Sequence, residues 1–319
     1  MGNFINFLAT NLGYILYIIY TVTKNYGISI VIFTIILKLL LLPLEIKQRI
    51  TNQKVMKVSE KQRVLSEKYK KDQAKYNSEI LKLYQKENLS IFAPFLGMLL
   101  TILQIFIILS VFYMVSKPLT YIKRMPQNEI DTYIAKTEEI NNNQNSNNNR
   151  NDFQKEIKVL QTIENDDKIK LNMNFLGIDL RDTPGEKVKS INDIKNIHNM
   201  KVMIIPILYI LISVINLTVA RKDLEKQRDT AKNENKNLNT AKDEKAEDKF
   251  TQDDFQDAMM SSQKIMTYIM PIMMFSVTMI TPLAVALYWL INTITEIVKI
   301  KVVKKIVDKK LEEEKQNKK

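Results

Sequence analysis

Residues 28–46 read ISIVIFTIILKLLLLPLEI, and this stretch decides the kind of fold to expect. A helix of about twenty apolar residues is long enough to cross the roughly 30 Å hydrocarbon layer of a bilayer. The apolar run is interrupted by Ser29, Thr34, Lys38, Pro43 and Glu45. We therefore predict a transmembrane helix over residues 26–46.

Four further apolar runs of similar length predict transmembrane helices over residues 91–116, 201–220, 263–281 and 282–300. Thr281 and Pro282 leave so little chain between the last two runs that these helices must form a tight antiparallel hairpin. The expected fold class is all-α, an integral membrane bundle of five transmembrane helices. Residues 1–25 form one apolar helical face beside Asn and Thr side chains, which favours an external interfacial amphipathic helix, with a sixth span as the alternative.

The remaining segments are polar. Residues 47–90 are helical in composition with a break at 70–77, where Asp72 can cap a helix, so we expect a helical hairpin. Residues 117–200 form a long loop whose asparagine-rich centre, 141–151, is expected to be disordered. Residues 221–262 are predicted to form a charged linker and residues 301–319 a basic tail.

The distribution of basic residues predicts the orientation. The hairpin, the cluster at 221–228 and the tail are rich in lysine and arginine, whereas only Lys24 precedes the first predicted span. Since short cytoplasmic segments carry the excess of positive charge, we place the hairpin, the linker and the C-terminus in the cytoplasm and the N-terminus outside. The 117–200 loop exceeds the length over which this rule operates, and it can be external.

Composition excludes several kinds of chemistry. The 319 residues carry a net charge of +12 but contain no cysteine and one histidine, His198. Disulfides, thiolate metal sites, cysteine nucleophiles and a histidine metal site are thereby excluded. We find no Ser-His-Asp arrangement and no phosphate-binding glycine loop, so we expect neither an enzyme nor a cofactor or metal.

Lys38 is the main candidate functional residue. It lies about 15 Å along its span, near the membrane midplane, where a charge costs roughly 2.5–3.5 kcal/mol on insertion scales and suggests a function. The alternative is a lysine satisfied by a neighbouring helix. Polar residues on several spans are predicted to line a water-accessible groove with it, although they could instead hydrogen-bond helix to helix. These residues are Thr34, Thr101, Gln104, Ser213, Asn216, Tyr288 and Asn292.

Four segments together resemble the YidC/Oxa membrane protein insertase family, in its small bacterial form. They are 26–48 (YGISIVIFTIILKLLLLPLEIKQ), 175–180 (FLGIDL), 263–273 (QKIMTYIMPIM) and 282–292 (PLAVALYWLIN). The resemblance implies a monomeric bundle with a hydrophilic groove that opens to the cytoplasm and into lipid, is closed on the outside, and holds a positive charge at the position of Lys38. The sequence departs from the family in having lysine rather than arginine there, no proline soon after Gln104, and a longer external loop.

The resemblance implies a membrane insertase and folding chaperone that moves client segments from the groove into the bilayer, alone or with the Sec translocon. The hairpin would receive clients first. Expected partners are nascent membrane proteins, the Sec translocon and anionic lipids, with the ribosome as a further candidate. The tail residues expected to contact clients or the ribosome are Lys304, Lys305, Lys309 and Lys310. The alternative function is a small-solute transporter or channel that uses Lys38.

Overall fold

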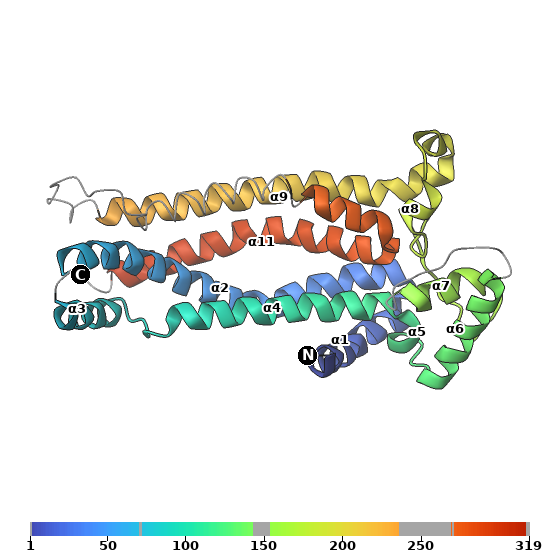
Figure 1. Ribbon diagram of the computed structural model, residues 1–319, viewed down its shortest axis with the longest axis horizontal. Coiled ribbons are helices and arrows are strands. Elements are labelled where there is room, and N and C mark those ends of the chain that lie inside the picture. The colour runs from blue at the N-terminus through green and yellow to red at the C-terminus, as the bar shows by residue number, and fades with distance from the viewer. Residues whose placement is uncertain (1, 70–71, 143–153, 236–268, 270, 317–319) are drawn as a thin grey trace. The chain divides into compact units, whose positions relative to one another are not determined.

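The structure is a computed structural model that describes residues 2–69, 72–142, 154–235, 269 and 271–316. Among these residues, five helices are long and apolar enough to cross a membrane (Figure 1). They are α1 (Gly2–Thr23), α2 (Tyr26–Lys68), α4 (Ala93–Ser116), α9 (Ile197–Asn235) and α11 (Leu283–Gln316). The predicted all-α membrane bundle is confirmed as a fold class.

The helices α2 and α9 contain the spans predicted over 26–46 and 201–220, while α4 and α11 begin two residues and one residue after the starts of the spans predicted over 91–116 and 282–300. The fifth is α1, for which we predicted an interfacial helix and kept a span as the alternative; its length and composition also suit a crossing. Of the span predicted at 263–281, the structure describes a shorter apolar helix, Pro271–Ile280. Most of 263–270 lies outside the described residues.

Contacts divide the chain into two compact units. The first comprises Met1–Leu39, Gln104–Ile215 and Tyr268–Glu296, and the second comprises Leu40–Leu103, Asn216–Thr267 and Ile297–Lys319. The helices α2, α4, α9 and α11 each contribute a segment to both units.

Aromatic side chains join the helices of the first unit. Phe112 on α4 stacks on Trp289 of α11 with ring centroids 5.9 Å apart, and Tyr209 of α9 approaches the same Trp289 at 6.4 Å. The Tyr26 hydroxyl at the start of α2 donates to the carbonyl of Val115 at 2.9 Å. These contacts place the first-unit segments of α2, α4, α9 and α11 around one buried core.

The segment predicted as a polar loop, 117–200, is largely structured where the structure describes it. It holds α5 (Pro118–Tyr121), α6 (Gln127–Asn142), α7 (Lys155–Thr162), the strands β1 (Asn174–Phe175) and β2 (Ile178–Asp179), α8 (Pro184–Lys187) and the 3₁₀-helix η2 (Ile191–Lys195) (Figure 1). Buried Ile130, Ile157, Leu160 and Leu180 belong to the same apolar core as the long helices of the first unit. The segment between α4 and α9, predicted as a long polar loop, thus contains short helices and a two-stranded hairpin where the structure describes it. Most of the asparagine-rich tract, from 143 onward, lies outside the described residues.

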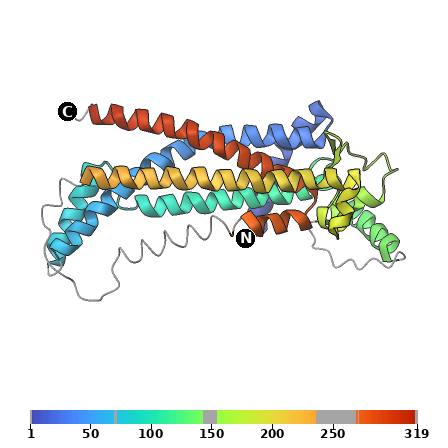
Figure 2. The same ribbon diagram turned by 90° about the horizontal axis from the view of Figure 1, so that it is seen from above.

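The predicted helical hairpin lies in the second unit. Its arms are the later part of α2 and the helix α3 (Gln73–Lys86), and the Asp72 carboxylate caps α3 by accepting from the Lys75 N–H at 3.0 Å. Gln62 donates to the Tyr76 hydroxyl across the arms at 3.1 Å. The helices α9 and α11 continue past the predicted spans to Asn235 and Gln316 (Figure 2). Segments predicted as linker and tail are thus helical there, because their Lys, Glu and Gln side chains favour helix.

Candidate functional site

Lys38 forms an ion pair inside the first unit. Its Nζ lies 2.9 Å from Oε2 of Glu296 on α11, and the two side chains keep 19% and 29% of their surface exposed. One helical turn before Lys38, Thr34 is buried and donates to the carbonyl of Ile30 in its own helix at 2.7 Å. The closest contact of Lys38 is therefore the one expected under the alternative interpretation, in which a neighbouring helix satisfies the lysine.

This pairing reduces the cost of a lysine between apolar helices. Breaking a buried ion pair by removing one partner typically costs about 3–5 kcal/mol, because the other charge is left uncompensated. Lys38 and Glu296 are partly exposed, so solvent screening lowers that cost here. The pair therefore lies among apolar helices with both side chains partly exposed.

The other predicted lining residues of the first unit differ in exposure. Gln104 on α4 and Asn292 on α11 are partly exposed, whereas Ser213 on α9 and Tyr288 on α11 are buried. Gln104 and Asn292 share the first unit with Lys38 and are the two candidate lining residues there, apart from Lys38, that are partly exposed.

Two predicted lining residues, Thr101 and Asn216, belong to the second unit. The Thr101 hydroxyl accepts from Nε2 of Gln48 at 3.3 Å and donates to the Gly97 carbonyl at 3.0 Å. Oδ1 of Asn216 is buried and has no hydrogen-bond partner. Because buried polar atoms are nearly always bonded, Asn216 is a position where a bound water would be favoured.

Further ion pairs hold the second unit together. Glu45 on α2 pairs with Lys299 on α11 at 2.8 Å, and Arg49 on α2 pairs with Asp223 on α9 at 2.5 Å. Lys304 also reaches Asp223, at 3.9 Å. Among the four candidate tail lysines, Lys304 is partly buried and contacts another helix, whereas Lys305, Lys309 and Lys310 are exposed on α11, where Lys309 lies 3.8 Å from Glu313.

One end of the first unit is closed by residues 172–182, which we call the strap. The Tyr26 N–H at the start of α2 donates to the Asn172 carbonyl at 2.9 Å. The Leu283 and Ala284 N–H groups at the start of α11 donate to the carbonyls of Asp182 and Leu180 at 2.8 and 2.9 Å. The first N–H groups of a helix have no partner within it, so the strap satisfies donors of two helices.

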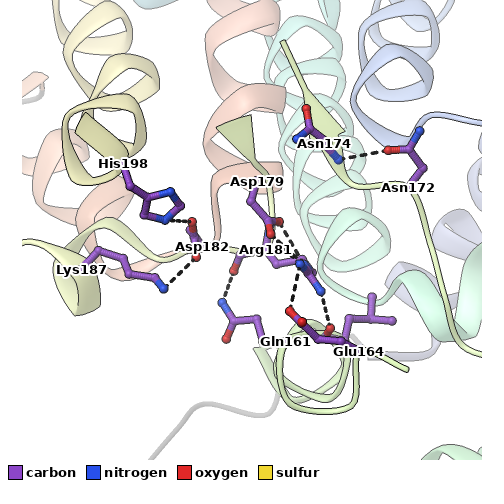
Figure 3. A network of polar contacts seen from close by, with 10 residues as sticks. Gln161, Glu164, Asn172, Asn174, Asp179, Arg181, Asp182, Lys187 and His198 are labelled. Atoms are coloured by element: carbon purple, nitrogen blue, oxygen red, sulfur yellow. Dashed lines mark hydrogen bonds and ion pairs between the residues drawn. The ribbon is translucent and has the colours of Figure 1, made fainter. Parts of the chain in front are cut away.

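Side chains fix the base of the strap (Figure 3). Arg181 lies between Asp179, at 2.6 Å, and Glu164, at 3.2 Å. Asp182 contacts Lys187 at 3.3 Å and Nε2 of His198 at 3.2 Å. The hydrogen bond to Asp179 raises the pKa of the Arg181 guanidinium. The strap is thus held by Glu164 just after α7, by α8 and by the start of α9.

Comparison with known proteins identifies the family. The model of a family described as 60Kd inner membrane protein matches residues 18–310. The chain belongs to this family. It is the YidC/Oxa family that the four sequence segments resemble, and it accounts for the long apolar helices; the chain is a multi-pass membrane protein of the bacterial cell membrane.

Curated relatives of the YidC/Oxa family share one segment with the chain. A protein of Caldanaerobacter subterraneus named membrane protein insertase YidC is 36% identical over 96 residues, which is 30% of this chain and 47% of that protein. One of the same name from Syntrophobacter fumaroxidans is 38% identical over 96 residues, 30% of this chain and 17% of that protein. The chain therefore matches less than half the length of these relatives.

Sequence reasoning missed two features of the site. The sequence does not single out Glu296 as the partner of Lys38, although its spacing from Asn292 puts both on one helical face. The strap was seen only as the FLGIDL segment of a loop. Its one signal for a turn is Gly177, because glycine readily adopts the positive φ that a tight turn needs.

Proposed function

We propose that the chain is a membrane protein insertase and folding chaperone that hydrolyses no nucleotide itself. Membership of the YidC/Oxa family and relatives named insertases support this proposal. The observation that carries it is the partly exposed Lys38–Glu296 pair among apolar helices, because it offers a client a charged, exchangeable contact where lipid offers none.

The proposed mechanism rests on solvation. A polar client segment that crosses hydrocarbon loses its hydrogen bonds to water, at several kcal/mol for each unsatisfied group. A wet groove beside Lys38, Gln104 and Asn292 supplies replacement bonds and shortens the dry path. The apolar segment of the client then moves sideways into lipid, where burial of its apolar surface drives insertion.

Glu296 has a specific part in this proposal. In the resting protein it is the counter-ion of Lys38. A carboxylate of the client replaces it, so Lys38 is never left without a negative partner during the exchange. The released Glu296 turns to solvent in the groove.

The proposed topology places the N-terminus and the strap outside and the hairpin and C-terminus in the cytoplasm. The excess of lysine and arginine in the hairpin and tail supports this orientation. The strap then closes the external end of the first unit. Proposed partners are nascent membrane proteins, the Sec translocon, anionic lipids and the ribosome, with the chain itself monomeric.

Reconstitution of the purified chain into liposomes tests the function. We expect insertion of a client with an acidic external segment in the order Lys38 about equal to Lys38→Arg, then Lys38→Ala, then Lys38→Glu. Arginine keeps the charge, whereas glutamate repels both Glu296 and the client. Lys299→Ala removes a paired lysine from α11 and serves as the matched control.

The alanine effect should be larger for an acidic client than for a neutral one. Equal insertion of both clients by Lys38→Ala protein at normal abundance would show that Lys38 is structural. Solute flux without insertion by the unaltered chain would instead support a transporter.

A further inference from the structure

Leu176 is the most exposed large apolar side chain among the described residues, with 87% of its surface accessible. It lies with Gly177 in the two-residue turn between β1 and β2, and both have positive φ, 54° and 80°. Such turns favour Asn-Gly, because asparagine tolerates the left-handed backbone and leucine does not. An apolar residue kept where asparagine would suit both the turn and water points to a use for its side chain.

The turn is presented rigidly. Asn174 pairs with Asp179 and Phe175 with Ile178, and the Gly177 N–H donates to Oδ1 of Asn174 at 3.0 Å. Phe175 lies so close to α2 that a Cβ added at Gly27 would come within 2.6 Å of its ring. The Arg181–Asp179 contact holds the base of the hairpin (Figure 3). Leu176 therefore has a fixed position in the first unit.

The turn lies beside the beginning of α9, since a Cβ at Gly177 would be 3.9 Å from Nζ of Lys201. The residues of α9 that follow this point alternate between a buried face and an exposed apolar stripe. The exposed stripe consists of Ile197, Met200, Ile204, Ile207, Leu208 and Leu211. In a membrane protein, a stripe of this kind faces lipid, and the turn that carries Leu176 lies beside the same part of α9.

We propose that Leu176 is a membrane anchor that inserts into the headgroup and acyl boundary of the leaflet at the strap end. The lysine beside it supports lipid as the occupant, because the Lys201 side chain is exposed and can place its ammonium at the level of lipid phosphates. The continuity with the lipid-facing stripe supports the same choice. A single projecting side chain is also much smaller than a stable protein interface.

The chain has no cysteine, so single thiols can be placed without background. The variants are Leu176→Cys, Leu208→Cys as the lipid-facing control and Lys136→Cys as an exposed control on α6. Each is assembled into a nanodisc, which leaves both membrane faces open to reagents, and carries a nitroxide. We expect the label at 176 to be relaxed by oxygen more than by a water-soluble nickel chelate, as at 208 and opposite to 136.

A nitroxide is itself apolar, so the unlabelled thiols provide a second measurement. In the same nanodiscs, a membrane-impermeant maleimide should modify Leu176→Cys at least about tenfold more slowly than Lys136→Cys, because a thiol in the interface is shielded from water. An unchanged melting temperature of Leu176→Cys establishes that it is folded. Modification at 176 as fast as at 136 in folded protein would overturn the anchor.

Discussion

Lys38 and Glu296 stand 258 positions apart in the chain and meet with Nζ and Oε2 separated by 2.9 Å. Glu296 pairs with the Lys38 ammonium, to which a client carboxylate would bind. Removing the charge of Glu296 should therefore have two opposite effects, one on stability and one on client binding. Glu296→Gln should lower the melting temperature, since Lys38 loses its counter-ion, and should increase crosslinking of Lys38 neighbours to acidic clients.

The charge exchange Lys38→Glu with Glu296→Lys provides the control. It restores the ion pair, so we expect the double variant to recover most of the stability lost by either single variant. Insertion of acidic clients should recover as well, because the positive charge stays in the same pair, now on α11 instead of α2. A double variant as unstable as the sum of the singles would mean that the pair contributes no coupling energy.

Thiol accessibility tests the proposed groove. Cysteine at Lys38, Gln104 or Asn292 should react with an impermeant reagent applied from the hairpin side, because each residue needs water or a polar client at its depth. Ile105 on α4 and Leu211 on α9 are exposed apolar positions and serve as lipid-facing controls. Labelling of the controls as readily as the three polar positions would exclude a water-filled groove.

Gly27→Ala should destabilise the attachment of the strap to α2. The added methyl would lie 2.6 Å from Cβ and Cδ2 of Phe175, too close for either residue to stay in place. Overpacking of this kind typically costs about 1–3 kcal/mol. Thermal unfolding measures the loss, and Phe175→Ala in the same chain should recover part of it. An unshifted melting temperature in Gly27→Ala would show that the strap moves freely from α2.

Glu156 should make the stability of the α5–α7 contact depend on pH. Its buried carboxylate accepts from the N–H groups of Leu119 and Thr120 at 2.7 and 2.9 Å, yet burial raises its pKa above the ordinary 4.5. Folding therefore favours the protonated form. The stability from this group is full below the ordinary pKa and is lost as pH rises through the raised one.

Melting temperatures measured across this pH range check the sign. Glu156→Gln should remove that part of the pH dependence, since an amide does not titrate. Glu156→Ala should lower stability at every pH by about 1–3 kcal/mol, because buried N–H groups lose their acceptor. A pH profile of Glu156→Gln identical to the unaltered chain would exclude Glu156 as its source.

The exposed lysines of α11 should bind the ribosome. Lys305, Lys309 and Lys310 can be changed to glutamine together without disturbing the Lys304–Asp223 contact or the buried Val307. We expect weaker cosedimentation with ribosomes and a shallower dependence on salt, because fewer counterions are released. Binding of the same variant to anionic liposomes is measured in parallel. If liposome binding falls and ribosome binding does not, lipid is the target of these lysines.

Apolar length was enough to predict most of the membrane fold. A run such as 28–46 has one stable solution in a bilayer, so α2 followed from composition alone. The partner of Lys38 did not, because which turn of α11 faces it depends on helix packing that one sequence does not specify. The layer formed by α5, α6 and α7 was missed since its apolar residues are few and lie between long polar stretches.

The hydrogen bonds of the strap also set the order in which parts of the protein can fold during synthesis. During synthesis from the N-terminus, the beginning of α2 must wait until Asn172 has left the ribosome before its first N–H group finds an acceptor. The carbonyls of Leu180 and Asp182 are then already in position when Leu283, about a hundred residues later, arrives to use them. The last long helix thus docks onto acceptors made earlier, and a ribosome that stalls before it would leave residues 1–282 with both acceptor carbonyls already made.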